Sequence, residues 1–238
     1  MLPYWSRPPN GESPGLPLPP PKVDGRAFVT GQHKYTSDLV REGMLYGKVL
    51  RAGAFNATLK SLDASEAEKL PGVKVVRDGN FAGVAAADSA TAIRALRALR
   101  AAWDAPQQTS ERTLFQDLRR PAAGPSDAPG GDPTYQSGSL EQGFAAAEKI
   151  LSQTYTVAYI AHAPLEPRAA VAEWNDGKLT VWTGTQRPFG VREALAEAFR
   201  LPLDSVHVLV PDTGSAYGGK HTADCATSAE MGQFETGS

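Results

Sequence analysis

The chain has 238 residues, of which 41% are hydrophobic and 21% charged, as in an ordinary globular protein. Its net charge of −2 gives no electrostatic reason to expect nucleic acid or an anionic membrane as a partner. The single cysteine, Cys225, excludes an intrachain disulfide and a cysteine metal site, and it favours a reducing, cytoplasmic location. No apolar run reaches the roughly 18 residues of a membrane-spanning helix, and we expect no signal peptide.

Proline dominates residues 1–21, which we predict to be an extended tail without regular ladders. The tail is either anchored to a partner through Tyr4 and Trp5 or free. Residues 22–103 mix short strands and helices, which predicts a small α+β domain. Its expected elements are a strand over 44–51, a helix over 65–70 with a capping box from Ser65 to Glu68, a hairpin over 73–86, and a helix from Asp88 or Ser89 to Trp103.

Residues 104–138 are rich in proline and glycine and are longer than an ordinary loop, so we interpret them as a linker between domains. Residues 139–238 form the second expected unit. Its predicted elements are a helix from Ser139 to about Leu151 with capping-box spacing from Ser139 to Gln142, a strand over 155–159, a hairpin over 169–183 around Asn175-Asp176-Gly177, a helix over 191–199 and a strand over 206–210. Because the helix that begins after His221 completes no apolar face, we expect more chain or a partner to cover this unit.

A glycine-rich loop follows the last predicted strand. Gly214, Gly219 and Lys220 have the G-x-x-x-x-G-K spacing of a phosphate-binding loop. However, His221 replaces the Ser or Thr that would hold magnesium, and no downstream acidic strand is available. Three interpretations stay open: a nucleotide P-loop, a structural turn, and backbone contact with another oxygen-rich ligand, which is the one we favour.

Gln186 lies at a strand-to-helix junction upstream of this loop. Its amide offers donors and an acceptor without a charge, which suits a polar ligand in a cleft. His162 and Glu166 have the spacing of one helical turn, but the prolines at 164 and 167 interrupt a helix, so we interpret the segment as an irregular loop rather than a metal site. There we expect an ion pair between Glu166 and Arg168.

Several motifs in order resemble the molybdenum hydroxylases, the xanthine dehydrogenase and aldehyde oxidase family, and most of all their molybdenum-binding large subunits of the isoquinoline and nicotinate dehydrogenase type. GQHKYTSDLVREGMLYGKVLR, LPGVKVVRDG and FAGVAAADSATAIRALRALRAAW are similar to the family's hammerhead α/β domain. HAPLEPRAAVAEW, TGTQRPFGVR and DTGSAYGGKH are similar to the start of its cofactor domain. The resemblance thus implies an α+β fold, with a hammerhead-like domain over 22–103 and a partial molybdopterin-binding domain over 139–238.

The resemblance also implies a molybdenum–molybdopterin cofactor, with the cytosine dinucleotide form among the options, and hydroxylation by water of an N-heteroaromatic or aldehyde substrate. By family position, Gln186, Tyr217, Gly218 and Gly219 bind the cofactor, Tyr217 and His221 face the substrate, and no residue ligates the metal directly. Purine-oxidising members carry Glu where this chain has His221, which argues against a purine. The loop also departs from the family in having Ala216 and Tyr217 where glycine and phenylalanine are commoner.

The family's glutamate base matches no residue in this span, so we expect no catalytic residue here and interpret the chain as the N-terminal part of a large subunit. Its expected partners are the remainder of that subunit and an iron–sulfur small subunit that holds the [2Fe–2S] clusters, since one cysteine cannot. The alternatives are a catalytically inert fragment, a protein-binding α+β module and a P-loop nucleotidase.

Overall fold

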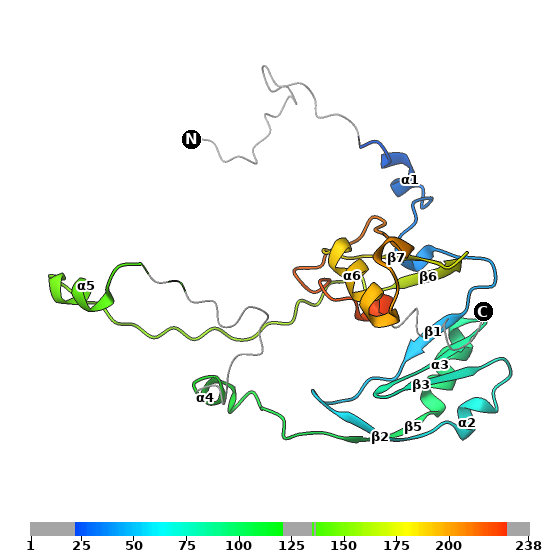
Figure 1. Ribbon diagram of the computed structural model, residues 1–238, viewed down its shortest axis with the longest axis horizontal. Helices are drawn as coiled ribbons and strands as arrows, with labels where there is room; N and C mark the ends of the chain where they lie inside the picture. The colour runs from blue at the N-terminus through cyan, green and yellow to red at the C-terminus, as the bar shows by residue number, and fades with distance from the viewer. Residues whose placement is uncertain (1–21, 121–134, 136, 228–238) are drawn as a thin grey trace, which may run out of the picture. The chain divides into compact units, whose positions relative to one another are not determined.

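The computed structural model describes residues 22–120, 135 and 137–227, which fall into two compact units (Figure 1). The first unit gathers residues 22–42, 165–216 and 220–227, and the second contains the other described residues. Helices and strands are mixed in the chain, which confirms the α+β prediction. The predicted tail over 1–21 and much of the predicted linker lie outside the described residues. Among the described helices, none combines the length and the apolar character needed to cross a bilayer.

The sheet of the first unit has the strand order β6-β7-β8. Strands β6 (Ala170–Asn175) and β7 (Lys178–Thr183) form the predicted hairpin. Asp176 and Gly177 have φ values of 49° and 75°, as a tight hairpin turn of primed type requires. Helix α6 (Pro188–Phe199), followed by the 3₁₀ helix η2 (Leu203–Ser205), then carries the chain to β8 (Val206–Leu209), which pairs with β7 in parallel.

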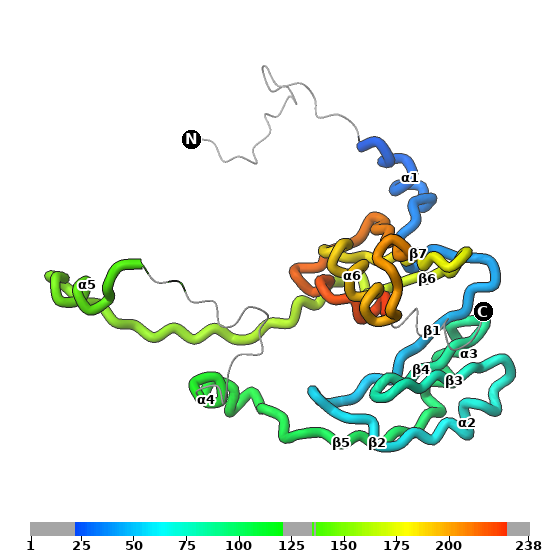
Figure 2. The backbone as a smooth tube through the Cα atoms, viewed as in Figure 1, coloured from blue at the N-terminus to red at the C-terminus, as the bar shows by residue number. Residues whose placement is uncertain are grey.

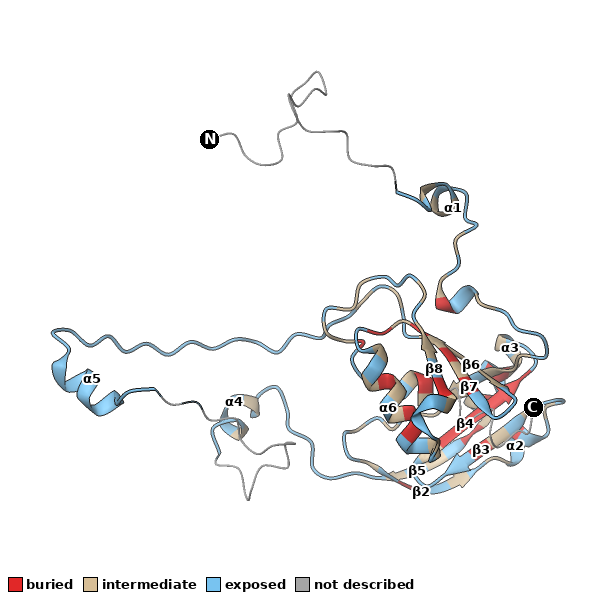
Figure 3. Ribbon diagram, turned by 45° about the horizontal axis from the view of Figure 1, so that its top comes forward, coloured by how far each residue is buried: buried red, intermediate tan, exposed pale blue. Residues whose placement is uncertain are grey.

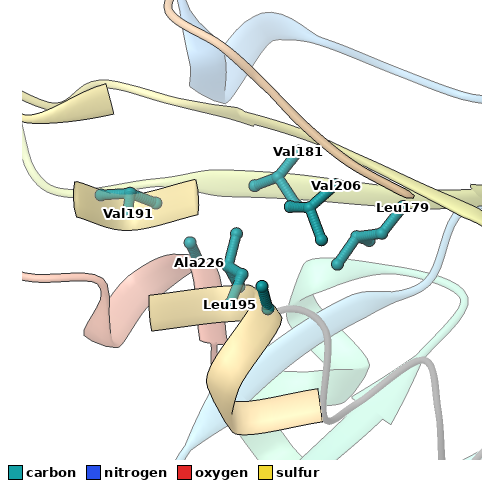
Figure 4. Packing of buried hydrophobic residues seen from close by; sticks show 7 residues of the cluster. Leu179, Val181, Val191, Leu195, Val206 and Ala226 are labelled. Atoms are coloured by element: carbon teal, nitrogen blue, oxygen red, sulfur yellow. The ribbon is translucent and has the colours of Figure 1, made fainter. Parts of the chain in front are cut away.

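Helix α6 packs its apolar face on this sheet and forms the core of the unit (Figure 4). Leu179 and Val181 alternate along β7 toward the helix, and Val191 and Leu195 lie one turn apart on α6. All four are at most 1% exposed. Ala226, in the helical turn that begins at Asp224, completes the cluster. The predicted helix after His221 therefore starts where expected, and its first turn does contribute to the core.

The N-terminal elements of the first unit are short: α1 (Gly25–Val29) and the 3₁₀ helix η1 (Thr36–Asp38). Arg41 follows them and binds Glu173 on β6, with Nε and Nη2 at 2.8 and 2.6 Å from the same carboxylate oxygen. Its guanidinium also lies 5.0 Å from the centre of the Trp182 ring. Arg41, far N-terminal to the sheet in the sequence, thus binds its edge strand β6.

The second unit contains an antiparallel sheet and a two-stranded ladder. Strands β1 (Tyr46–Val49), β4 (Phe81–Ala86) and β3 (Lys74–Asp78) pair in the order β1-β4-β3, and β3–β4 is the predicted hairpin. Helix α3 (Ser89–Ala98) packs on β1 and β4, and its buried Ala92 and Ala95 contribute to the core. The carboxylate of Asp88 accepts from the Thr91 N–H at 2.8 Å, so Asp88 is the cap.

The prediction that α3 continues to Trp103 is wrong. The helix ends at Ala98, and Leu99 turns the chain to an extended conformation with φ −66° and ψ 138°. Residues Arg100–Asp104 then form β5, which pairs with the unpredicted strand β2 (Thr58–Asp63). Every second residue of β5 is half-buried, the period of a strand, and this pairing overrides the helical propensity of the arginine- and alanine-rich stretch.

Residues 147–164 run as an extended segment after α5 (Leu140–Ala146), as Figure 2 shows. The predicted strand over 155–159 is wrong, because no described strand pairs with it and Tyr155, Val157 and Tyr159 are 72–84% exposed. The predicted helix from Ser139 is shorter than expected and wholly exposed (Figure 3). It lacks the tertiary packing that stabilises a longer helix.

The two predicted capping boxes differ in outcome. The Ser139 side chain does accept from the Gln142 N–H, at 3.3 Å, at the start of α5. Ser65 is not a cap, because it is the first residue of α2 (Ser65–Glu68), and both its N–H and its hydroxyl donate to Asp63. A short helix α4 (Leu114–Asp117) follows β5.

Candidate functional site

Three segments of the chain start or finish at one end of the sheet of the first unit. Strands β7 and β8 are parallel, so both finish at this end of the sheet, at Thr183 and Leu209. Strand β6 runs the other way and begins there, since Ala170 is the partner of Thr183. The segment before β6, the loop after β7 and the glycine-rich loop after β8 therefore converge, as loops at strand ends do in ligand sites of mixed folds.

A buried ion pair joins two of these loops. The Lys220 ammonium, only 2% exposed, binds the carboxylate of Glu166, which is 24% exposed. The same carboxylate oxygen accepts from the Thr213 hydroxyl and from the Gly214 N–H, both at 2.7 Å. Thr213 Oγ1 also accepts from Lys220 Nζ at 3.1 Å. Two charged and two polar groups thus satisfy one another inside the protein.

Ionisation of Glu166 is set by two opposing effects. Burial disfavours the charged form, but the hydrogen bonds from Lys220, Thr213 and Gly214 outweigh it and hold the pKa of the Glu166 carboxyl below its ordinary value. The carboxylate is therefore charged at neutral pH and neutralises Lys220.

The predicted site residue Gln186 lies in the loop between β7 and α6 and is joined to the end of the glycine-rich loop. Its N–H donates to the Lys220 carbonyl at 2.9 Å, and its side-chain oxygen accepts from the Lys220 N–H at 3.4 Å. The hydroxyl of Thr185 donates to the same Lys220 carbonyl at 3.1 Å and accepts from the Arg187 N–H at 3.0 Å. Proline at the first helical position, residue 188, then starts α6 directly after this contact.

The glycine-rich loop turns sharply where Tyr217, Gly218 and Gly219 are predicted to act. Tyr217 and Gly218 have positive φ values of 51° and 92°, and the Tyr217 side chain is 72% exposed. A Cβ built on Gly218 would lie 3.3 Å from the Nε2 atom of His162. The backbone is thus bare of a side chain at Gly218 and cannot carry one without strain. His221, the other predicted substrate-facing residue, is exposed just after this turn.

The ion pair predicted between Glu166 and Arg168 is wrong. The chain bends at Leu165 and Glu166, and Glu166 reaches Lys220, whereas Arg168 binds Asp224 at 3.1 Å and Thr222 at 2.9 Å. The segment is irregular, as expected. Within the ranges that the structure describes, no three His, Cys, Asp or Glu side chains converge so as to hold a metal ion.

The nucleotide P-loop interpretation does not survive this geometry. A P-loop lysine must reach the phosphates, but the Lys220 ammonium is almost wholly buried and paired with Glu166. A separate hollow in the second unit contains none of the predicted site residues; Phe55, Asn56, Pro106, Gln108 and Leu114 contribute to its lining. Glu166 and Thr213 were not predicted as members of the site, and the only sequence signal for them is a lysine directly after two glycines.

Comparisons with known proteins give a consistent result. Residues 125–235 match the family model of the molybdopterin cofactor-binding domain. The chain is 30% identical over 229 residues to a probable xanthine dehydrogenase subunit of Bacillus subtilis, covering 84% of this chain and 31% of that protein. It is 31% identical over 223 residues to a nicotinate dehydrogenase subunit of Pseudomonas putida, covering 89% of this chain and 18% of that protein.

Solved structures share the fold. The aldehyde oxidoreductase of Desulfovibrio gigas matches with a TM-score of 0.70 and 21% identity, over 89% of this chain and 29% of that one. Quinoline 2-oxidoreductase of Pseudomonas putida 86 matches with a TM-score of 0.65 and 23% identity, over 88% of this chain and 33% of that one. The chain therefore spans about a third or less of the length of these relatives.

Proposed function

The chain belongs to the xanthine dehydrogenase and aldehyde oxidase family of molybdenum enzymes, and on that premise we propose that it contributes part of a molybdopterin site in a hydroxylase. The observation that carries the proposal is the double hydrogen bond between Gln186 and Lys220, which joins the loop after β7 to the glycine-rich loop after β8. These are the two loops whose sequences resemble the family's cofactor loops.

The residues present fit such a cofactor. Lys220 is neutralised by Glu166, so the loop offers peptide groups and one amide rather than a free cation. Gly218, with φ 92°, lets the backbone turn sharply, so that the loop can offer peptide groups to a ligand. The residues that would hold the cofactor are Gln186, Tyr217, Gly218 and Gly219. When bound, the cofactor supplies two-electron oxidation chemistry for hydroxylation by water.

The chain's own residues would orient the substrate and the cofactor. The side chain of Gln186 can donate to the cofactor's acceptor atoms while its oxygen stays on the Lys220 N–H. The exposed Tyr217 hydroxyl can bind a ring nitrogen or a carbonyl oxygen of the substrate. That Gln186 and Gly218 act on one cofactor, and that His221 faces the substrate, are parts of the same proposal.

The substrate class that we propose is an N-heteroaromatic compound or an aldehyde. The names of the relatives, nicotinate dehydrogenase and aldehyde oxidoreductase among them, support this range. By the family resemblance, members that oxidise purines carry Glu at the position of His221. The histidine therefore argues against a purine substrate. The cytosine dinucleotide form of the cofactor belongs to the same hypothesis.

The complete enzyme would need parts that this span does not supply. Because the chain covers 31% of a B. subtilis relative, we infer that the rest of a large subunit closes the site and holds the catalytic base. We also infer an iron–sulfur partner subunit and a cytoplasmic location. A hammerhead-like domain over 22–103, a linker over 104–138 and a partial molybdopterin-binding domain over 139–238 remain our proposed organisation.

Metal content tests the proposed function. The chain would be produced in a host that makes the molybdenum cofactor, alone and together with the missing large-subunit part and the iron–sulfur subunit. We expect molybdenum and pterin to copurify near one per chain in the complete assembly, and Gln186→Ala to lower both. Absence of molybdenum from every assembly would refute the proposal.

One observation favours the alternative of a protein-binding module. The extended segment over 147–164 exposes Tyr155, Val157, Tyr159 and Ile160, each by 72% or more. Such a segment suits pairing with another polypeptide. This alternative predicts that a partner protein protects these residues from proteolysis while no molybdenum is bound.

A further inference from the structure

We propose that Lys220 is a positioning residue whose buried ion pair with Glu166 fixes the glycine-rich loop and, through its own peptide group, the Gln186 side chain. The inference deepens the proposed function and rests on it. It assigns a role to Lys220, Glu166 and Thr213, none of which is among the predicted cofactor-binding residues.

Lys220 contacts all three loops, through its side chain and through its main chain. Its side chain binds Glu166, in the segment before β6, and Thr213, at the start of the glycine-rich loop. Its main chain accepts from Thr185 and Gln186 and donates to Gln186, in the loop after β7. A displacement of Lys220 would therefore move the Gln186 amide and the end of the glycine-rich loop together.

The surroundings are shaped to hold this arrangement. A Cβ on Gly214 would lie 3.0 Å from the Cβ of Glu166, and a Cβ on Gly184 would lie 2.8 Å from the Thr213 hydroxyl. Only glycine lets both segments approach the ion pair so closely. Glu166 Oε2 receives three donors, one each from Lys220, Thr213 and Gly214, so the carboxylate determines where the loop begins as well as where it ends.

Lys220 acts through other residues rather than on a ligand. At 2% exposure its ammonium is not presented to a cofactor or a substrate. A buried charge is costly, and in some proteins it is retained because it specifies one arrangement over others, which is the role inferred here. Lys220 acts by keeping the glycine-rich loop in one ordered position.

The test compares four variants of the complete assembly with wild type. Lys220→Met and Glu166→Gln each leave one charge unpaired, the double variant removes both charges, and Thr213→Val keeps both charges but removes the bridging hydroxyl. Arg168→Met is the matched control, because it breaks the neighbouring, half-exposed ion pair with Asp224. The measurements are amide hydrogen exchange over 213–220, with Leu179 and Val181 as internal references, and bound molybdenum and pterin per chain.

We expect each single charge variant to accelerate exchange in the loop at least tenfold and to lower bound cofactor at least tenfold, with exchange at Leu179 and Val181 unchanged. The double variant should regain part of the cofactor, Thr213→Val should show about a threefold effect, and Arg168→Met none. If the charge variants do not fold, the effect of Thr213→Val on loop exchange and bound cofactor decides whether the inference holds. Unchanged loop exchange, or equal acceleration in β7, would overturn the inference.

The same experiment separates this inference from the proposed function. If wild type binds no molybdenum in any assembly, the proposed function fails. The exchange measurement still reports whether the ion pair orders the loop, because it does not depend on a bound cofactor.

Discussion

Gln186 and Lys220 are 34 residues apart in the sequence and exchange two hydrogen bonds, at 2.9 and 3.4 Å. This pairing holds two loops at the edge where β7 and β8 end. It depends on the parallel pairing of those strands, and therefore on the core beneath α6 that fixes the helix against the sheet.

Leu195 tests that core. It is fully buried on α6 and packs with Leu179 and Val191. Leu195→Ala should lower the free energy of unfolding by about 3 kcal/mol, because the truncated side chain leaves a cavity. Urea unfolding followed by tryptophan fluorescence measures the change. Leu165→Ala, at a side chain that is 98% exposed, should cost less than about 0.5 kcal/mol.

Stability should depend on pH through Glu166. Folding lowers the pKa of its carboxyl from the ordinary value of about 4.5, so the unfolded chain binds the proton more readily in the window just below that value. The stabilising contribution is therefore complete at neutral pH and is lost as the pH falls through the lower, folded-state pKa.

The measurement is urea unfolding of wild type and Glu166→Gln at pH 7 and at steps below pH 5. At pH 7 the variant should be less stable by about 3 kcal/mol, because Lys220 loses its partner, and the difference should shrink in acid. Glu148→Gln, which removes an exposed carboxylate outside the network, is the control. A difference that grew as the pH fell would contradict the assignment.

Gly184 tests how closely the loops approach. Gly184→Ala would place a methyl group 2.8 Å from the Thr213 hydroxyl and should destabilise the protein by about 1–3 kcal/mol through overpacking. Gly47→Ala is the comparison, because apart from the two neighbouring residues no atom lies within 4 Å of the added Cβ. Thermal unfolding of both variants gives the answer, and equal melting temperatures would argue against a tight contact.

Gly218 tests the turn that we propose to face the cofactor. Gly218→Ala introduces a side chain at φ 92°, and Gly177→Ala introduces one at φ 75° in the β6–β7 hairpin turn. Both should cost about 1–2 kcal/mol in backbone strain. Only Gly218→Ala should reduce the molybdenum content of the complete assembly, measured by elemental analysis. Equal metal loss in both would mean that stability alone governs cofactor retention.

Local sequence signals predicted the elements of the first unit well. Asn175-Asp176-Gly177 between two apolar runs indicated the β6–β7 hairpin, and the spacing of Val191 and Leu195 indicated α6. In the second unit, the helical pattern of RALRALRAAW continues past the true end of α3. Only the pairing of β5 with β2, far away in sequence, makes the last residues a strand. Periodicity within a window cannot detect that competition.

The candidate site was predictable to a similar degree. Gln186 and the glycine-rich loop could be singled out, because each lies at a strand end and has distinctive residue types. The partner of Glu166 could not, because Arg168 is near in sequence whereas Lys220 is 54 residues away and is brought close only by the fold. Whether a lysine after two glycines serves a phosphate or an internal carboxylate is decided by burial, which the sequence does not state.

The antiparallel register of β6 and β7 places the Asn175-Asp176-Gly177 turn at the opposite end of the hairpin from Gln186. A dye or an electrode linker attached through a cysteine introduced at Asp176 would therefore be separated from the converging loops by the full length of the hairpin. That turn is a suitable place to tether this unit to a surface, away from the loops that we propose to bind the cofactor.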